Sequence, residues 1–208
     1  MMTHADTRSL VIASDYRVPD PSRVPRLLAN NTSALAEIGA HHVIVHASST
    51  DQGRVLVSLV VQNREPIVDL LRSRVFFDWF DAVGVEDIPA VFAGELVDRI
   101  DIKDSADPAA PGVIVAAMTS VHDVAELIDH VHSALDRFEA AGVLKTWIFQ
   151  AFDDPREVMI LSEIDSADNA RRWIEHPDPA AEWMANAGIG AYPPLFVGTL
   201  LETMRIES

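Results

Sequence analysis

Histidine is the residue type in this chain with the widest chemical use, and the sequence contains eight. Neutral imidazole is the commonest metal ligand in proteins. His42 and His46 share one face of a predicted strand, but they stand about 13 Å apart, which is too far for one ion. His130 and His132 lie two positions apart in a predicted helix and point in different directions. The spacing therefore predicts no metal centre.

His46 is a candidate proton acceptor. Aligning Gly39 with Gly142 places His46 at the strand position of Phe149, and Ile44 at that of Trp147. An imidazole whose unperturbed pKa is about 6.5 suits general-base catalysis. The alternative is a core histidine that is hydrogen-bonded to a backbone carbonyl or a neighbouring side chain. The sequence leaves both interpretations open.

Asp15 and Tyr16 end the first predicted strand, where the second half of the chain has Met118 and Thr119. Such a difference between two similar halves indicates specialisation. One hypothesis makes Asp15 or Tyr16 a group that orients a ligand. The alternative is that polar residues at a strand end serve solubility alone.

The composition excludes several function classes. The chain has no Cys, so disulfides, thiolate nucleophiles and Cys-ligated metal clusters are impossible. The formal net charge of −16 at pH 7 disfavours nucleic acid and membrane surfaces as partners. No apolar stretch reaches the ~18 residues that span a bilayer, and the first residues lack the basic start of a secretion signal. We expect a soluble cytoplasmic protein.

The motifs of common enzyme classes are also absent from the sequence. It contains no G-x-S-x-G, G-x-x-x-x-G-K-[ST], H-E-x-x-H or G-x-G-x-x-G. Serine hydrolase, P-loop, zincin and dinucleotide-binding interpretations therefore lack their usual support.

An internal repeat is the strongest signal in the sequence. One constant offset pairs seven residues with identical residues further on: Trp79 with Trp183, Gly84 with Gly188, Pro89 with Pro193, Phe92 with Phe196, Gly94 with Gly198, Leu96 with Leu200 and Ile102 with Ile206. Gly and Pro each make up only roughly 5–7% of an average protein, so chance does not explain the match. The pattern indicates a tandem duplication.

Each half reads as strand, helix, strand, strand, helix, strand. Apolar runs at 9–13 and 113–117 predict the first strands, and a 3.6-residue apolar stripe predicts a helix that ends at Gly39 or Gly142. Hairpins are predicted within 42–61 and 146–164. The second helices are expected to begin near Pro66 and Ser166, and the last strands to cover 90–100 and 195–204.

This order predicts an α+β protein of two tandem ferredoxin-like βαββαβ repeats that pack sheet to sheet as an intramolecular dimeric α+β barrel. A ferredoxin-like repeat has helices on only one face of its sheet, so the other face needs a partner. We assign residues 1–8 to an N-terminal tail, 9–102 to the first repeat, 103–112 to a Pro-rich linker and 113–206 to the second repeat. A monomer that is a pseudo-dimer and a homodimer both fit this arrangement.

In the order of its elements the chain resembles the dimeric α+β barrel superfamily, which includes antibiotic-biosynthesis-monooxygenase-like, haem-degrading and EthD-like proteins. The resemblance covers nearly the whole chain, and its most family-like stretches are residues 170–177, 183–188 and 193–198. It implies a small apolar or aromatic ligand in a cleft between sheet and helices, often with no metal or organic cofactor. His176 is placed much as the helical His of haem-degrading members is, but residues 11–16 and 113–119 lack the Asn of those members. Haem turnover is therefore not expected.

The leading hypothesis is that this protein binds or oxidises a small apolar or aromatic molecule without metal or organic cofactor. His46 or His176 would act as the base, and Tyr16 or Asp15 would orient the ligand. The candidate ligand contacts are the aromatic residues Trp147, Phe149, Trp173 and Trp183. The alternative is a non-catalytic structural or stress-related protein whose interior is filled by side chains.

Overall fold

The structure is a computed structural model that describes residues 9–64, 74–103, 112–175 and 195–207. Three sequence predictions lie outside these ranges: the helix start near Pro66, the candidate base His176 and the candidate ligand contact Trp183.

The described residues form eight strands and six helices. The first half of the chain contains β1 (Leu10–Arg17), α1 (Arg23–Ala29), α2 (Thr32–Glu37), β2 (Ala40–Ser48), β3 (Arg54–Val61), α4 (Arg74–Val83) and β4 (Ala90–Asp101). The second half contains β5 (Val113–Ser120), α5 (Val124–Ser133), α6 (Leu135–Ala140), β6 (Val143–Ala151), β7 (Glu157–Ile164), α7 (Ala167–Glu175) and β8 (Phe196–Arg205). The predicted α+β class and the ferredoxin-like order of elements are confirmed.

The first helix of each half differs from the prediction, because it is broken into two short helices. Between α1 and α2, the side-chain amide of Asn31 donates to the carbonyl of Leu27 at 2.8 Å. Between α5 and α6, the hydroxyl of Ser133 donates to the carbonyl of His130 at 2.8 Å. Side chains that bond to nearby backbone carbonyls compete with regular helix geometry, and they coincide with both breaks.

The ends of the helices follow the predicted signals. Gly39 and Gly142 have φ of +76° and +85°, the left-handed conformation that terminates a helix and turns the chain into the next strand. The hydroxyl of Ser166 accepts a hydrogen bond from the backbone N–H of Asn169 at 3.2 Å, as expected for the start of α7.

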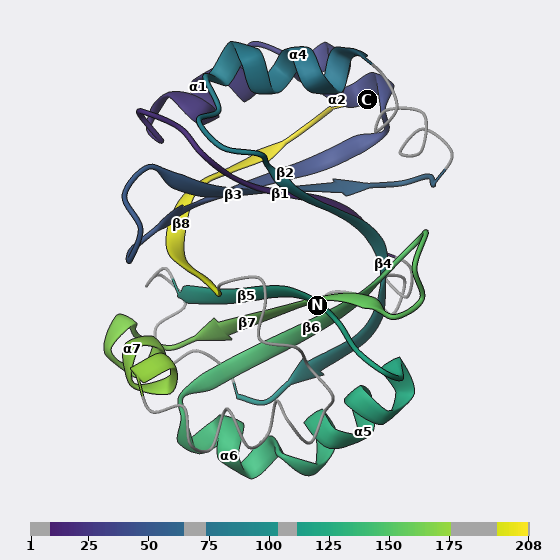
Figure 1. Ribbon diagram of the computed structural model, residues 1–208, viewed down its shortest axis with the longest axis vertical. Helices are drawn as coiled ribbons and strands as arrows, with labels where there is room; N and C mark the ends of the chain where they lie inside the picture. Colours follow the sequence, from purple (N-terminus) through teal and green to yellow (C-terminus); the bar gives the residue numbers. More distant parts are fainter. Residues whose placement is uncertain (1–8, 65–73, 104–111, 176–194, 208) are drawn as a thin grey trace. The chain divides into compact units, whose positions relative to one another are not determined.

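The first sheet has β3 at its centre, antiparallel to β1 and to β2. Six of the eight β3 residues are buried and the other two half-buried, which is the pattern of a strand covered on both faces. Helices α1, α2 and α4 lie on one face of this sheet (Figure 1), and they bury Val24, Leu28 and Leu35.

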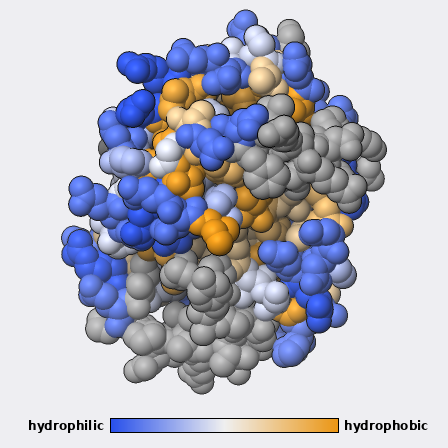
Figure 2. All heavy atoms as spheres, turned by 45° about the horizontal axis from the view of Figure 1, so that its top comes forward, coloured by the Kyte–Doolittle hydropathy of each residue, from blue (hydrophilic) through white to orange (hydrophobic). Residues whose placement is uncertain are grey.

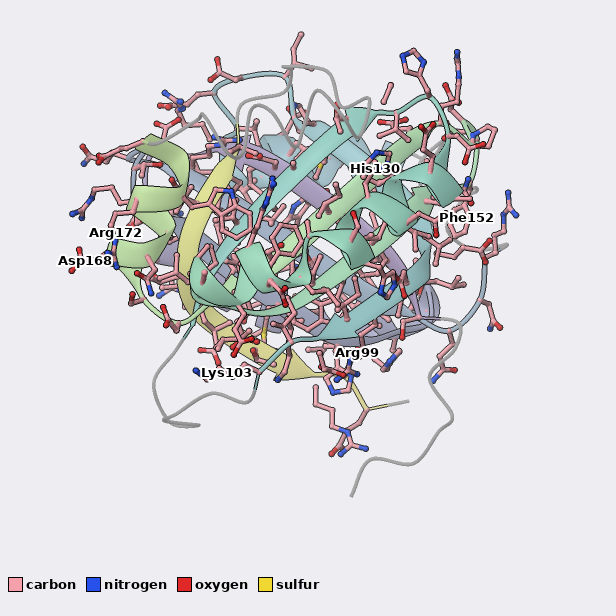
Figure 3. The ribbon with its side chains drawn as sticks, turned by 90° about the horizontal axis from the view of Figure 1, so that it is seen from below. Arg99, Lys103, His130, Phe152, Asp168 and Arg172 are labelled. Carbon is pink, nitrogen blue, oxygen red and sulfur yellow. The ribbon has the colours of Figure 1, made fainter. Side chains whose placement is uncertain are left out.

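The second sheet repeats this arrangement, with β7 between β5 and β6. Helices α5, α6 and α7 lie on one of its faces (Figure 1), and Figure 3 views the molecule from the side of α5 and α6. Leu127, Val131 and Phe138 of these helices pack with Ile148 and Val158 of the sheet in one core cluster.

The chain divides into two compact units whose limits do not coincide with the sequence halves. One unit comprises the described residues up to Ala93 and from Leu200, and the other comprises those from Gly94 to Thr199. The boundaries cut β4 and β8, so each of these strands runs from one unit into the other. From Gly94 onward β4 pairs with β6, and β8 pairs with β5 up to Thr199. The hydrogen-bonded strand order is β1-β3-β2-β8-β5-β7-β6-β4.

The repeats at 9–102 and 113–206 stay a prediction about the sequence, because these compact units are a different division of the chain. In the described ranges, no helix combines the length and apolar character needed to cross a membrane. Hydrophilic side chains spread over much of the face shown in Figure 2, with hydrophobic ones between them.

Candidate functional site

Asp15, Leu56 and His46 form a row across the first sheet. Leu56 of β3 lies opposite Asp15 of β1 on one side and opposite His46 of β2 on the other. Directly opposed residues share a face, so the three side chains point the same way. Tyr16 follows Asp15 and points to the other face, where its ring meets that of Phe80 of α4, with 5.4 Å between centroids. We call the face of the row the open face, because α1, α2 and α4 do not cover it, and the face under these helices the helix face (Figure 1).

Asp15 is half of a two-pronged ion pair with Arg54. Arg54 Nε donates to Asp15 Oδ1 at 2.8 Å, and Arg54 Nη2 donates to Asp15 Oδ2 at 2.6 Å. Both side chains are only 14% exposed. The hydrogen bond with Asp15 raises the pKa of Arg54, so the guanidinium stays charged. Beside it, Arg17 pairs with Asp51 at 2.5 Å. The two cations of this region are therefore both neutralised by carboxylates.

His46 is a buried neutral imidazole. It is 7% exposed, and burial lowers its pKa from 6.5 to about 4, because an imidazolium would lose its hydration. Its Nδ1 has no hydrogen-bond partner among the described residues. Ser58 lies two residues after Leu56 on β3, so it shares the open face. Its hydroxyl is also buried and without a hydrogen-bond partner within the described ranges.

Tyr16 is the polar group of the helix face. The residue is 3% exposed, and its hydroxyl makes no hydrogen bond of normal geometry to the part of the chain that the structure describes. Burial raises the pKa of Tyr16, an effect that the Trp79 side chain offsets in part. Tyr16 is therefore a protonated phenol at neutral pH, able to donate a hydrogen bond to a ligand oxygen or nitrogen.

The second sheet has apolar residues at the positions of the polar row. Met159 of β7 lies opposite both Met118 and Phe149, and Leu161 lies opposite Trp147. The registers make these positions equivalent to those of the first sheet, with Met118 in place of Asp15, Phe149 in place of His46 and Leu161 in place of Ser58. The two open faces therefore differ in chemistry.

The helix face of the second sheet carries a hydrophobic core cluster. The Trp173 ring of α7 stacks on Phe138 with 5.3 Å between centroids, and both belong to the core cluster of that unit. The buried hydroxyls of Thr146 and Ser162 hydrogen-bond to each other at 3.0 Å. Thr119 stands at the position equivalent to Tyr16. The hydroxyls of Thr146 and Ser162 are thus paired, whereas the Tyr16 proton on the first helix face has no acceptor among the described residues.

The residues proposed from the sequence are divided between the faces of two sheets. Asp15 and His46 share the open face of the first sheet, whereas Tyr16 points to its helix face. Trp147 and Phe149 share the open face of the second sheet. Trp173 lies on the helix face of the second sheet, and His176 and Trp183 lie outside the described residues.

Sequence reasoning missed Ser58 and Arg54. Ser58 is the only polar residue in the run from Val55 to Val61, and that interruption was a signal for a polar group in a buried strand. Arg54 gave no such signal, because its partner Asp15 is 39 positions away and only the β1–β3 register brings them together.

Metal ligands do not cluster in the described residues, where no group of three or more His, Asp or Glu could hold an ion.

Two antiparallel sheets, each covered by helices on one face, form an α+β fold with the ferredoxin-like order of elements. The chain is similar over its whole length to an anthrone oxidase-like protein, with a TM-score of 0.71, 11% identity and 97% of that chain covered. A monooxygenase-like protein from Listeria innocua matches 97% of this chain and 99% of its own, with a TM-score of 0.53 and 13% identity.

A haem-binding protein from Thermus thermophilus matches 94% of this chain and 92% of its own, with a TM-score of 0.56 and 14% identity. Identities this low show a shared fold and nothing finer. No protein-family description and no curated protein matches the sequence.

Among the candidate residues that the structure describes, none on the helix face of the first sheet suits a haem iron. Haem iron needs an axial His, Cys, Met or Tyr ligand. Tyr16 is buried and holds its proton, so it does not offer the phenolate that iron binds. His176 lies outside the described residues.

Proposed function

We propose that this protein binds a small apolar or aromatic molecule between the first sheet and its helices, without metal or organic cofactor. The names of two similar structures, an anthrone oxidase-like and a monooxygenase-like protein, support oxidation of that molecule as the reaction. Dioxygen would be the oxidant: a methylene of the ligand becomes a carbonyl, one oxygen atom enters the product and the other leaves as water. The likeness in fold supports this class of function, and the buried hydroxyl of Tyr16 supports the position of the binding site.

The Tyr16 hydroxyl is the observation that carries this proposal. The Trp79 indole can only donate to the Tyr16 oxygen, so the phenol proton has no acceptor among the described residues. An unsatisfied buried donor costs about 1–3 kcal/mol of stability, so native proteins rarely retain one unless it has a partner to receive. The ring of Tyr16 packs edge-on against Phe80, and Trp79 is close by. A ligand here would place its apolar body against aromatic rings and accept one hydrogen bond from the phenol.

The first repeat carries the site in this proposal, and the second does not. Thr119 stands at the position of Tyr16, and Phe138 stacks on Trp173 in the core cluster under the helices of the second sheet. The difference between Asp15-Tyr16 and Met118-Thr119 that the sequence displays supports the same division of roles.

Proton transfer at this site would need a base on the helix face. His46 points to the opposite face of the sheet, so it does not contact a ligand that lies beside Tyr16. His176 is the base that the sequence proposes, and it lies outside the described residues. Tyr16 would orient the ligand by its hydrogen bond.

Native mass spectrometry of protein purified from its own host tests the proposal. We expect a bound small molecule on the wild type, and about five- to tenfold weaker binding of that molecule to Tyr16→Phe, because one hydrogen bond is lost. Thr119→Val is the matched control, since it removes the hydroxyl at the equivalent position of the other sheet, and its binding should equal that of the wild type. Equal binding by Tyr16→Phe and the control would refute the site.

The second candidate function is a structural protein with a filled interior, which the packed helix face of the second sheet favours. That function predicts no co-purified molecule. We also propose a cytoplasmic location and a monomeric pseudo-dimer, with the homodimer as the other outcome of a light-scattering measurement of mass.

A further inference from the structure

The open face of the first sheet holds two buried polar atoms without partners. His46 is 7% exposed and Ser58 is 6% exposed, and neither His46 Nδ1 nor Ser58 Oγ has a hydrogen-bond partner among the described residues. Buried polar groups in folded proteins are almost always hydrogen-bonded. Two unpaired atoms on one face of two adjacent strands therefore indicate a molecule that binds both.

The strand register places the two side chains close together. His46 lies opposite Leu56, and Ser58 is the next residue of β3 on the same face, so the two are diagonal neighbours with Cα atoms about 7–8 Å apart. Ile44 lies opposite Ser58, and Ala13 flanks Ser58 from β1. A single hydroxyl group between His46 and Ser58 can donate to the imidazole and accept from the serine.

The charges beside this place are internally neutralised. Both oxygens of Asp15 accept from Arg54, and Arg17 is paired with Asp51. A charged ligand would lose its hydration here and find no unpaired opposite charge among these groups. The ligand must therefore be uncharged.

We propose that His46 and Ser58 form a second binding site, on the open face of the first sheet, for an uncharged hydroxyl compound such as a phenol or an alcohol. The ligand hydroxyl donates to His46 Nδ1 and accepts from Ser58 Oγ, and its apolar part contacts Ile44, Leu56 and Ala13. The site is independent of the proposed ligand at Tyr16, because the sheet separates the two side chains.

The second sheet has no counterpart of this site. Phe149 stands at the position of His46 and Leu161 at that of Ser58, so neither hydrogen bond is available there. The described strands therefore offer this site once, and Phe149 and Leu161 are matched control positions.

The test uses phenol as the probe and toluene as a probe of nearly the same shape without the hydroxyl group. The ¹⁵N signals of the His46 ring are followed by NMR, and they are identified by their loss in His46→Phe. We expect phenol to shift the Nδ1 signal saturably and toluene to leave it unchanged. Ser58→Ala should weaken the affinity for phenol about fivefold, because one hydrogen bond is removed. Tyr16→Phe and Phe149→Leu should leave this affinity unchanged.

A Nδ1 signal that phenol does not shift, or that toluene shifts equally, overturns the proposal. A crystal structure in which one ordered water bridges His46 and Ser58, and phenol at saturating concentration does not displace it, overturns it as well. Ser58→Ala removes only one oxygen atom, so the test stands even where His46→Phe does not fold. If Tyr16→Phe no longer binds the co-purified molecule but still binds phenol at His46, each of the two sites is supported separately.

Discussion

At the scale of single residues, the chemistry of the first sheet depends on which face each polar side chain occupies. Asp15 and Tyr16 are adjacent in sequence, yet one forms an ion pair on the open face and the other packs against Phe80 on the helix face. Strand alternation separates them, so a single ligand does not contact both. The same rule separates His46 from Tyr16, and it assigns the two candidate groups to two different sites.

The burial of His46 predicts a stability that depends on pH. Its pKa is 6.5 in the unfolded chain and about 4 in the folded protein, so the unfolded state binds the proton first as the pH falls. The stabilisation is therefore complete above pH 6.5 and declines between pH 6.5 and pH 4, by about 3 kcal/mol in total.

Urea unfolding of the wild type and His46→Phe at pH 7.5, 5.5 and 4.5 measures this effect. Phe is the residue at the equivalent position of β6, so the variant keeps an apolar ring on the open face. The difference in unfolding free energy between the two proteins should change in favour of the variant as the pH falls. A difference that stays constant with pH would show that His46 is not buried as a neutral imidazole.

At the scale of elements, the turn between β2 and β3 sets the register that places Leu56 opposite His46. Gly53 in this turn has φ of +85°, and its carbonyl accepts from the backbone N–H of Val18 at 2.9 Å. A Cβ atom at this position would lie 2.7 Å from the Val18 carbonyl oxygen. That oxygen belongs to the backbone, so relief of the clash requires the turn to move.

Gly53→Ala should therefore cost more stability than Gly39→Ala. Gly39 also has a positive φ, of +76°, but its nearest atom to an added Cβ is 3.9 Å away. The control should lose about 1 kcal/mol from the left-handed backbone alone, and Gly53→Ala about 2–3 kcal/mol with the clash added. Chemical denaturation measures both, and equal losses would mean that the turn accommodates the methyl group.

At the scale of the whole molecule, β4 connects the two sequence halves by hydrogen bonds. From Gly94 to Asp101 it pairs with β6, although it belongs to the first half of the sequence. Near the C-terminus, the N–H of Ile206 donates to the carbonyl of His41 at 3.0 Å. Each half thus supplies backbone hydrogen bonds to strands of the other.

Cleavage of the predicted linker should therefore leave the halves associated. A protease site inserted within residues 103–112 and then cut should yield fragments that elute together at the mass of the intact 22.8 kDa chain under native conditions. Denaturant should separate them. Separate elution without denaturant would show that the β4–β6 pairing is too weak to hold the halves together.

Local signals in the sequence were enough to predict the class of fold, the order of elements and the equivalence of the two halves. Apolar periodicity gives strands and helices, and Gly39 and Gly142 mark turns that need a positive φ. The equivalence of His46 with Phe149, and of Asp15 with Met118, was also predicted, because alignment of similar halves requires no knowledge of contacts.

Contacts between distant parts of the chain came from the folded structure: which face of each strand meets helices, that β4 pairs with β6, and that Arg54 is the partner of Asp15. Alternation along a strand tells which residues share a face, but only packing tells which face the helices cover. Strand pairing joins residues far apart in the chain, and its register depends on many weak contacts that must form together. The candidate residues could therefore be named from the sequence, while their division between two sites could not.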